Sequence, residues 1–161
     1  MRYQSETAKC RERLLHFCAG KGLDLGCGTD KITLHAFGVD SRPLPGVDRV
    51  DTINFLDWVP ADSQDFIFSS HALEHLEYPW LALKEWLAKI KPGGHLVLYL
   101  PHKDHYRDYN PEHHWNPTPL VARGMIGWAA GSLGRRADFV WEYLDVGEDR
   151  YSFDLVAQVL G

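Results

Sequence analysis

The stretch "GLDLGCGTDK", Gly22 to Lys31, decides how the rest of the sequence is interpreted. A short apolar run with an acid inside it, Asp24, leads directly into glycines at positions 26 and 28. Glycine lets the backbone turn tightly and approach another group closely, and in a strand it often marks such an approach. The stretch therefore predicts a strand that ends in a tight turn beside a ligand crevice.

A dinucleotide such as NAD or FAD is the first candidate for that ligand, but the pattern departs from its fingerprint at two points. The third glycine of G-x-G-x-x-G would fall at position 31, which is Lys31. The acid that ends the next apolar run, Asp40, comes 14 residues after Gly26, whereas the fingerprint places its acid roughly 20 residues on. These departures argue against a dehydrogenase and leave room for another nucleotide-like ligand.

The composition is that of a soluble globular protein and argues against a nucleic-acid partner. The chain has 161 residues, of which 45% are hydrophobic, and we expect residues 1–161 to form a single domain. Acidic residues outnumber basic ones, 22 to 17, and the formal net charge is −5. Binding through phosphates needs clustered basic charge, which the sequence lacks.

The sequence also favours a cytoplasmic protein without a membrane partner. The N-terminal stretch has no continuous apolar segment typical of a signal peptide, and no run is long enough to span a bilayer. The cysteines, Cys10, Cys18 and Cys27, are odd in number and form no C-x-x-C pair, which is typical of reduced thiols in the cytosol.

Hydrophobic patterning predicts an α/β architecture. "DFIFSS" and "HLVLYLP" are strands that are apolar almost throughout, as expected for a sheet covered on both faces. The spacing predicts helices over about 5–18, 79–90 and 120–133. In the second of these, Trp80, Leu83, Leu87 and Ile90 share a face. The last two strands, 136–145 and 150–160, are expected to form an antiparallel hairpin at a sheet edge. Residues 102–119 are expected to form a long polar and aromatic loop, and loops of this length inside a compact domain are often functional.

Four segments in order, "DLGCG", "GVDS", "DFIFSSHALEHL" and "KPGGHLVLYLP", resemble the class I S-adenosylmethionine (SAM)-dependent methyltransferases. Within that family the chain is most similar to the small type with a Leu-Glu-His turn and a Lys-Pro-Gly-Gly turn, as in ubiquinone-biosynthesis-like methyltransferases. The likeness covers residues 22–102 well and the strand "SFDLVAQ" loosely. It implies SAM as cofactor and a Rossmann-like domain. Its sheet is mostly parallel and seven-stranded, with an antiparallel terminal strand and a shortened N-terminal half.

The resemblance implies a role for each residue around the predicted crevice. Asp24 resembles the acid that positions the ammonium end of the cofactor. Asp40 resembles the acid that accepts both ribose hydroxyls, for which two carboxylate oxygens are suited. The other positions implied for the cofactor are the low-bulk turn Leu25, Gly26, Cys27 and Gly28, then Lys31, Ser41, the adenine-reading pair Asp51 and Thr52, and Ser70 and His71 near the sulfonium.

The segment after the glycine turn departs from the family pattern. Only "TDKITLHA" separates the turn from the next strand, where most relatives have a full helix, so we expect about one helical turn there. Lys31 is then either the counter-charge of the cofactor's carboxylate or an ordinary surface lysine. Taken singly, Asp24 could instead satisfy backbone amides and Asp40 could close a turn. Cys27 is expected to pack rather than to act as a nucleophile.

Histidines are the candidates for the chemistry, because an unperturbed imidazole can remove a proton near neutrality. His71 and His102 follow two predicted strands and are proposed as base or acceptor-positioning groups. Glu74 and His75 are interpreted as an interior hydrogen-bonded pair that braces the site. No metal is expected, although His71, His75, His102, His105, His113 and His114 leave a metal site, and with it hydrolysis, as an open alternative.

The acceptor is expected to be a small or medium organic molecule, a glycan or a carrier-bound intermediate, methylated at oxygen. The Asn/Asp-Pro-Pro-aromatic signature of amino-group DNA methyltransferases is absent, and "SSHA" stands in its place. The acceptor side is expected to be covered only by the 102–119 loop and an N-terminal segment, so a partner subunit, as in a homodimer, could complete the pocket. In that loop His113 and His114 could also serve only folding, with Tyr106, Tyr109 and Trp115 packing beneath. The alternative function is a non-catalytic SAM-fold module that binds cofactor or serves a partner.

Overall fold

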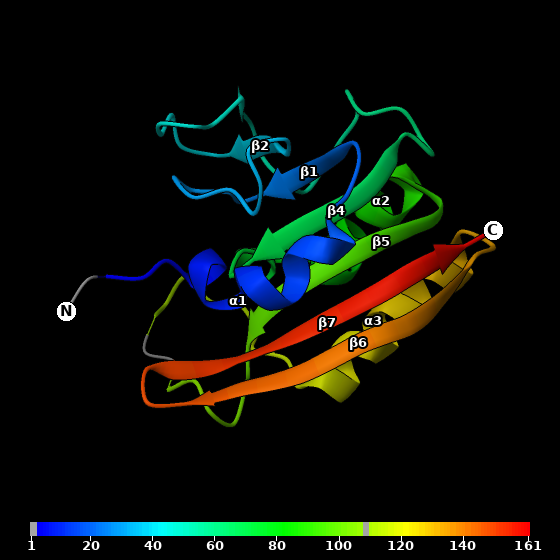
Figure 1. Ribbon diagram of the computed structural model, residues 1–161. Helices are drawn as coiled ribbons and strands as arrows, with labels where there is room; N and C mark the ends of the chain where they lie inside the picture. The colour runs from blue at the N-terminus through cyan, green and yellow to red at the C-terminus, as the bar shows by residue number, and fades with distance from the viewer. Residues whose placement is uncertain (1–2, 108–109) are drawn as a thin grey trace.

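A computed structural model describes residues 3–107 and 110–161 and shows a seven-stranded sheet with helices on both faces (Figure 1). The strands are β1 (Gly22–Leu25), β2 (Phe37–Asp40), β3 (Arg49–Val50), β4 (Gln64–Ser70), β5 (Ile90–Pro101), β6 (Arg136–Gly147) and β7 (Arg150–Leu160). Their order is β3-β2-β1-β4-β5-β7-β6. All pairs from β3 to β5 are parallel, and β7 is antiparallel to both β5 and β6. The predicted sheet and terminal hairpin are confirmed.

The helices bury both faces of this sheet. They are α1 (Glu6–Leu14), continued by the 3₁₀ turn η1 (Leu15–Phe17), α2 (Pro79–Lys89) and α3 (Pro119–Ser132). In Figure 1, α1 lies on the near side of the strands and α2 and α3 on the far side. One buried cluster joins α2 and α3 to β1, β4, β5 and β7, and a second joins Cys10 and Leu14 of α1 to Phe68, Tyr99 and Val156. The strands between are apolar on both sides because both sides are covered.

Helix α2 buries most, but not all, of the face that its spacing predicts. Leu83, Leu87 and Ile90 are fully buried, whereas Trp80, which the spacing assigns to the same face, is 40% exposed. Trp80 lies in the first turn at the margin of the apolar stripe and lines a surface hollow beside α3. Trp86 takes the core position instead, and its Nε1 donates to the carbonyl of Ile53 at 2.8 Å.

The segment between β1 and β2 forms turns and bends. It contains no helix, so the single helical turn expected there is wrong. Ile32 and Ala36 from this segment are nevertheless buried in the α1-side cluster. Two apolar side chains thus close this part of the core without a helix, and the shortened N-terminal half is confirmed.

The "KPGG" segment lies inside β5 rather than before it. The pairing of β4 with β5 moves from Gln64↔Ile90 to Phe66↔His95, a bulge that absorbs the extra residues. Gly94 is required there, because a Cβ would lie 2.7 Å from the carbonyl oxygen of Asp65.

The loop between β5 and α3 closes on itself and packs on the sheet. The N–H of Lys103 donates to the carbonyl of Pro117 at 3.0 Å, and the ring of Tyr106 lies 4.7 Å from that of Tyr151. Tyr109, expected to help pack this loop, lies outside the described residues.

Across residues 3–107 and 110–161, no helix is both long and apolar enough to cross a bilayer.

Candidate functional site

The glycine turn sits at the carboxyl ends of β1 and β2. The N–H groups of Gly26 and Cys27 both donate to the carbonyl of Val39, at 2.8 and 3.2 Å, which ties the turn to β2. Gly26 has φ +75°, and a Cβ on it would lie 2.5 Å from the Cβ of Ala72, so conformation and space both require glycine. Gly28 has φ +55°, but a Cβ on it would meet nothing within 4 Å. The open side of the turn is therefore at Gly28, where a ligand can approach the backbone.

Asp40 points at this turn from the end of β2. Its carboxylate is 4% exposed, and Oδ2 accepts the N–H of Gly28 at 2.8 Å. Oδ1 accepts both the N–H and the Nε of Arg42, each at 3.1 Å, and the Arg42 side chain is 65% exposed. Burial alone would raise the pKa of Asp40, but the bonds from Arg42 and Gly28 outweigh it and lower the pKa below its ordinary value. Asp40 is thus an ionised hydrogen-bond acceptor, and its Oδ1 is covered by the exposed side chain of Arg42.

Asp24 lies inside β1 on the other side of the turn. The carboxylate is 1% exposed, and Oδ2 accepts the N–H of Ile32 at 2.7 Å, so it does satisfy a backbone amide. The other oxygen, Oδ1, is buried and has no hydrogen-bond partner among the described residues. Burial raises the pKa of Asp24 to about 7. An unpartnered buried carboxylate oxygen is costly, and a cationic ligand group would relieve that cost.

The remaining residues of the predicted cofactor set lie along the same edge. Ser41 and Thr52 are exposed, and the N–H of Asp51 donates to the carbonyl of Asp40 at 3.0 Å, which places Asp51 at the tip of β3. Lys31 pairs with Asp48 at 2.9 Å and its side chain is 15% exposed. Cys27 is 5% exposed, and burial raises its thiol pKa to about 12, so it is protonated at neutral pH.

Ser70 and His71 end β4 on the α1 side of the sheet. The Oγ of Ser70 is buried without a partner in the described part of the chain. His71 has φ +48°, its ring packs on Tyr99, and its Nε2 lies 2.8 Å from the Oγ of Ser152. Burial, with the nearby Lys9 charge, lowers the pKa of His71 to about 3. His71 is therefore neutral and weakly basic at physiological pH.

His102, at the end of β5, packs on the opposite side. The ring of His102 contacts Phe153, which belongs to the core under α2 and α3. The backbone N–H of His102 donates to the carbonyl of Tyr151 at 2.8 Å. The backbone N–H of Asp104 donates to Nδ1 at 3.1 Å. The neutral ring then carries its proton on Nε2 and offers a hydrogen-bond donor. Burial also lowers its pKa. Among the described residues no hydrogen bond or ring contact joins His71 to His102.

Glu74 and His75 lie in the 3₁₀ turn η2 (Leu73–His75) that follows β4. Glu74 is fully buried, and its Oε1 lies 3.7 Å from Nε2 of His75, beyond hydrogen-bond distance. They are neighbours, as expected, but the direct hydrogen bond of the predicted bracing pair is not formed.

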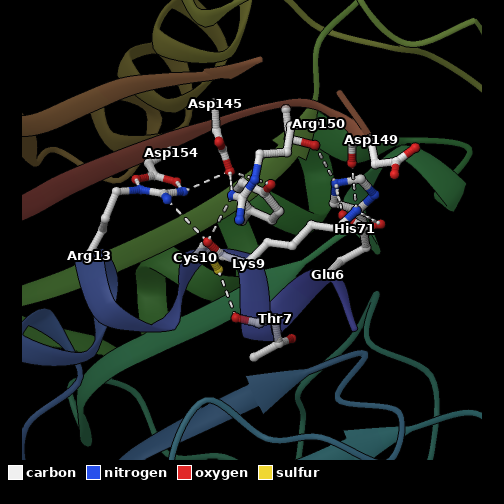
Figure 2. Close-up of polar contacts among 12 residues, drawn as sticks. Glu6, Thr7, Lys9, Cys10, Arg13, His71, Asp145, Asp149, Arg150 and Asp154 are labelled. Carbon is white, nitrogen blue, oxygen red and sulfur yellow. Dashed lines mark hydrogen bonds and ion pairs between the residues drawn. The ribbon is translucent and has the colours of Figure 1, made fainter. Parts of the chain in front are cut away.

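A buried ion cluster that the sequence does not predict fastens α1 to the terminal hairpin (Figure 2). Arg13 donates to both oxygens of Asp154, at 2.7 and 2.9 Å, and to Asp145 at 3.0 Å. Asp145 also accepts from Tyr99 and Arg150, each at 2.8 Å. The signal in the sequence is an acid, Asp154, inside an otherwise apolar strand. The cluster matters to the site because Ser5, at the start of α1, donates to Asp30 in the glycine-turn segment.

Comparison with known proteins places the chain in one family. The family model for the methyltransferase domain matches residues 2–147, so the chain belongs to this family of class I SAM-dependent methyltransferase domains. Trans-aconitate 2-methyltransferase of Azoarcus sp. (strain BH72) is 29% identical over 134 residues, which cover 71% of this chain and 49% of that protein. The chain thus spans about half the length of this curated relative.

Solved structures share the fold at low sequence identity. A chain of the complex that contains the Haloferax volcanii Trm112 methyltransferase activator has a TM-score of 0.73 and 14% identity, covering 97% of this chain and 90% of that one. The Burkholderia thailandensis 1,6-didemethyltoxoflavin-N1-methyltransferase, solved with S-adenosylhomocysteine (SAH), has a TM-score of 0.72 and 14% identity, covering 95% and 77%. These likenesses establish the Rossmann-like fold with order 3-2-1-4-5-7-6.

Proposed function

We propose that this domain transfers a methyl group from SAM to a carboxylate oxygen of a small or medium organic acid. The observation that carries the cofactor half of the proposal is the pair of buried carboxylates, Asp24 and Asp40, on two sides of a glycine turn that is open at Gly28. One of them has an unpartnered buried oxygen, and the other has an oxygen covered only by an exposed arginine.

These residues fit the polar groups of SAM. The Oδ1 of Asp24 would hold the ammonium group, and the Oδ1 of Asp40 would accept the ribose hydroxyls once Arg42 moves aside, with Asp51 and Thr52 nearest the adenine. SAM, when bound, supplies a methyl group already activated by its positive sulfur. The chain has to align the acceptor, exclude water and manage any proton.

The two candidate histidines support an acceptor that arrives already ionised. His71 is too weak a base, with a pKa of about 3, to remove a proton at neutral pH. His102 presents a donor on Nε2 because its Nδ1 is occupied. A carboxylate needs no base, and a donor suits it, so His102 is proposed as the group that positions the acceptor. The name of the Azoarcus relative, a trans-aconitate methyltransferase, points to the same acceptor chemistry.

The test is a methyl-transfer assay with radiolabelled SAM and a panel of organic acids, phenols and amines. The proposal predicts label on an acid, in a product from which mild alkali releases methanol, because a methyl ester hydrolyses whereas methyl ethers and N-methyl groups do not. An alkali-stable product on a phenol or an amine would contradict the carboxylate assignment.

His102→Ala is expected to raise the KM for the acid acceptor while leaving SAH affinity within about twofold, since the loss of one hydrogen bond is confined to the acceptor side. His114→Ala, which removes an exposed imidazole from the same loop, serves as the control and should change neither. Acceptor kinetics and calorimetric titration with SAH measure the two quantities. A parallel loss of both in His102→Ala would indicate a structural role.

Cofactor affinity is expected to depend on pH through Asp24. The group's pKa is raised to about 7, so it is protonated below that pH and cannot pair with an ammonium group. SAH affinity should therefore be level above pH 7 and fall as pH decreases below it, by up to about tenfold per pH unit. Titrations between about pH 5.5 and about pH 8 measure this, with Asp24→Asn as the control. An equally steep dependence in Asp24→Asn would assign it to another group.

A non-catalytic module is the competing function, favoured by the absence of a helix after the glycine turn in the described chain. Calorimetric titration with SAM and SAH separates the two functions. A chain that binds both ligands but methylates nothing in the panel would support the module. A chain that binds neither would refute the cofactor site itself.

A further inference from the structure

We propose that Glu74, His75 and His113 form a binding site for a divalent transition-metal ion, with Zn²⁺ as the ion best suited to its donors. The ligand atoms that these three residues offer all lie within 4.8 Å of one another. Glu74 and His75 come from the η2 turn after β4, and His113 comes from the β5–α3 loop, 38 residues further along the chain. The fold therefore assembles a set whose combination the sequence does not single out.

The spacing of Glu74 and His75 is close to that of two ligands of one metal ion. Ligand atoms about 2.1 Å from a tetrahedral ion are about 3.4 Å apart. The Oε1 of Glu74 and the Nε2 of His75 are 3.7 Å apart, too far for a hydrogen bond but within a few tenths of an ångström of that value. The rings of His75 and His113 have their centroids 4.6 Å apart and cross at 87°, so they are not stacked on each other.

His113 is oriented as metal-binding histidines usually are. Its Nδ1 lies 3.1 Å from the side-chain oxygen of Asn116, which can only accept, so the ring proton is on Nδ1 and the lone pair is on Nε2. Metal-bound histidines typically donate their second ring N–H to an oxygen in this way, which fixes the tautomer. The neighbouring backbone is also held, since the N–H of His114 donates to the carbonyl of Glu74 at 2.8 Å.

Charge and donor type favour a metal ion as the occupant. Glu74 is fully buried, and a buried carboxylate is stabilised when a cation compensates its charge. Two imidazole nitrogens and one carboxylate are a donor set that Zn²⁺ uses with a fourth position left for water. The ion would fasten the β5–α3 loop to the end of β4.

The experiment uses the whole chain, treated with chelator and titrated calorimetrically with Zn²⁺ alone, and Co²⁺ as a spectroscopic substitute. We expect one equivalent of Zn²⁺ per chain and, with Co²⁺, the intense visible absorption of a four-coordinate site. Hydrogen exchange should slow in the loop residues around 110–117 when Zn²⁺ is added. No cofactor or acceptor is present, so the result is independent of the proposed methyl transfer.

The decisive variants are His113→Gln and His114→Gln, which remove neighbouring imidazoles from the same loop. His114 is exposed and contributes only its backbone N–H to η2, so its variant should bind Zn²⁺ like the wild type. His113→Gln should lose at least roughly tenfold in affinity, the lower limit of what removing a mere outer-shell partner costs. Should Glu74→Gln fail to fold, His75→Gln is the second ligand variant and should lose as much. Equal Zn²⁺ affinity in the His113 and His114 variants, or no Zn²⁺ bound by the wild type, would overturn the proposal.

Discussion

Asp40→Ala is expected to weaken SAH binding by about 2–4 kcal/mol, a loss of affinity between roughly thirtyfold and several hundredfold. The carboxylate is buried, its pKa is held below the ordinary value, and its Oδ2 accepts the N–H of Gly28 at the open side of the turn. It is therefore an ionised acceptor fixed beside the space where the cofactor is proposed to lie. Calorimetric titration of the variant with SAH measures the loss.

Two further substitutions separate a binding role of Asp40 from a structural one. Asp40→Asn keeps an oxygen for the N–H of Gly28, so it preserves the turn while removing the charge and one acceptor. Arg42→Ala removes only the exposed side chain that competes for Oδ1, so it should leave SAH affinity unchanged or raise it by severalfold at most. Wild-type affinity in Asp40→Ala would show that the ribose assignment is wrong. A large loss in Arg42→Ala would show that the arginine, and not the carboxylate, holds the ligand.

Arg13→Met is expected to destabilise the fold by about 3 kcal/mol or more, because it removes the charged partner of the fully buried Asp154 carboxylate and leaves Asp145 with Arg150 as its charged partner. The side chain of Asp154 is fully buried and that of Asp145 is 6% exposed, and Arg13 bonds to both (Figure 2). Trp141 still donates to Asp154 at 3.1 Å, but a neutral donor does not replace the charge. Urea denaturation followed by circular dichroism measures the change in the free energy of unfolding.

The same helix provides the control. Arg11 pairs with Asp30 and also donates to the carbonyls of Lys31 and Ile32, but Arg11 and Asp30 are about a third exposed, so Arg11→Met should cost less, no more than about 2 kcal/mol. The double variant Arg13→Met/Asp154→Asn should recover part of the loss, since it removes one stranded charge. Similar destabilisation by Arg11→Met and Arg13→Met would mean that packing of α1, rather than the buried ion cluster, holds the helix.

The strands were the most predictable part of the fold, and the reason is local. The central strands that the sequence singles out, such as "GLDLG" and "DFIFSS", are short runs of mainly apolar residues closed by glycine or polar turn residues, and burial on both faces needs nothing more specific. Helix faces were harder. Trp80 and Trp86 are equally apolar, but Trp86 lies among the buried residues Ala82 and Leu87, whereas Trp80 lies at the margin of that face and lines a surface hollow beside α3. The missing helical turn after Gly28 depends on Ile32 and Ala36 finding a place against α1, which is a tertiary contact.

In the candidate site, too, only the features that depend on local sequence were predictable. The residues expected around the glycine turn lie on one sheet edge because parallel strands bring their carboxyl ends together. The histidines do not follow this rule, since successive side chains of a strand point to opposite faces. Ser152 and Phe153 are successive residues of β7 and point to opposite faces of the sheet. His71 contacts Ser152 on the α1 side, and His102 contacts Phe153 on the other side. The Glu74, His75 and His113 cluster combines a turn with a loop, so no spacing in the sequence could define it.

The most direct test of the account is a crystal structure of the chain with SAH. We predict the ribose hydroxyls within hydrogen-bond distance of the Asp40 carboxylate, the amino group at the Oδ1 of Asp24, and Arg42 displaced from its present contact. SAH bound at another place, with Arg42 still on Asp40 and the Oδ1 of Asp24 still without a partner, would contradict the proposed cofactor site.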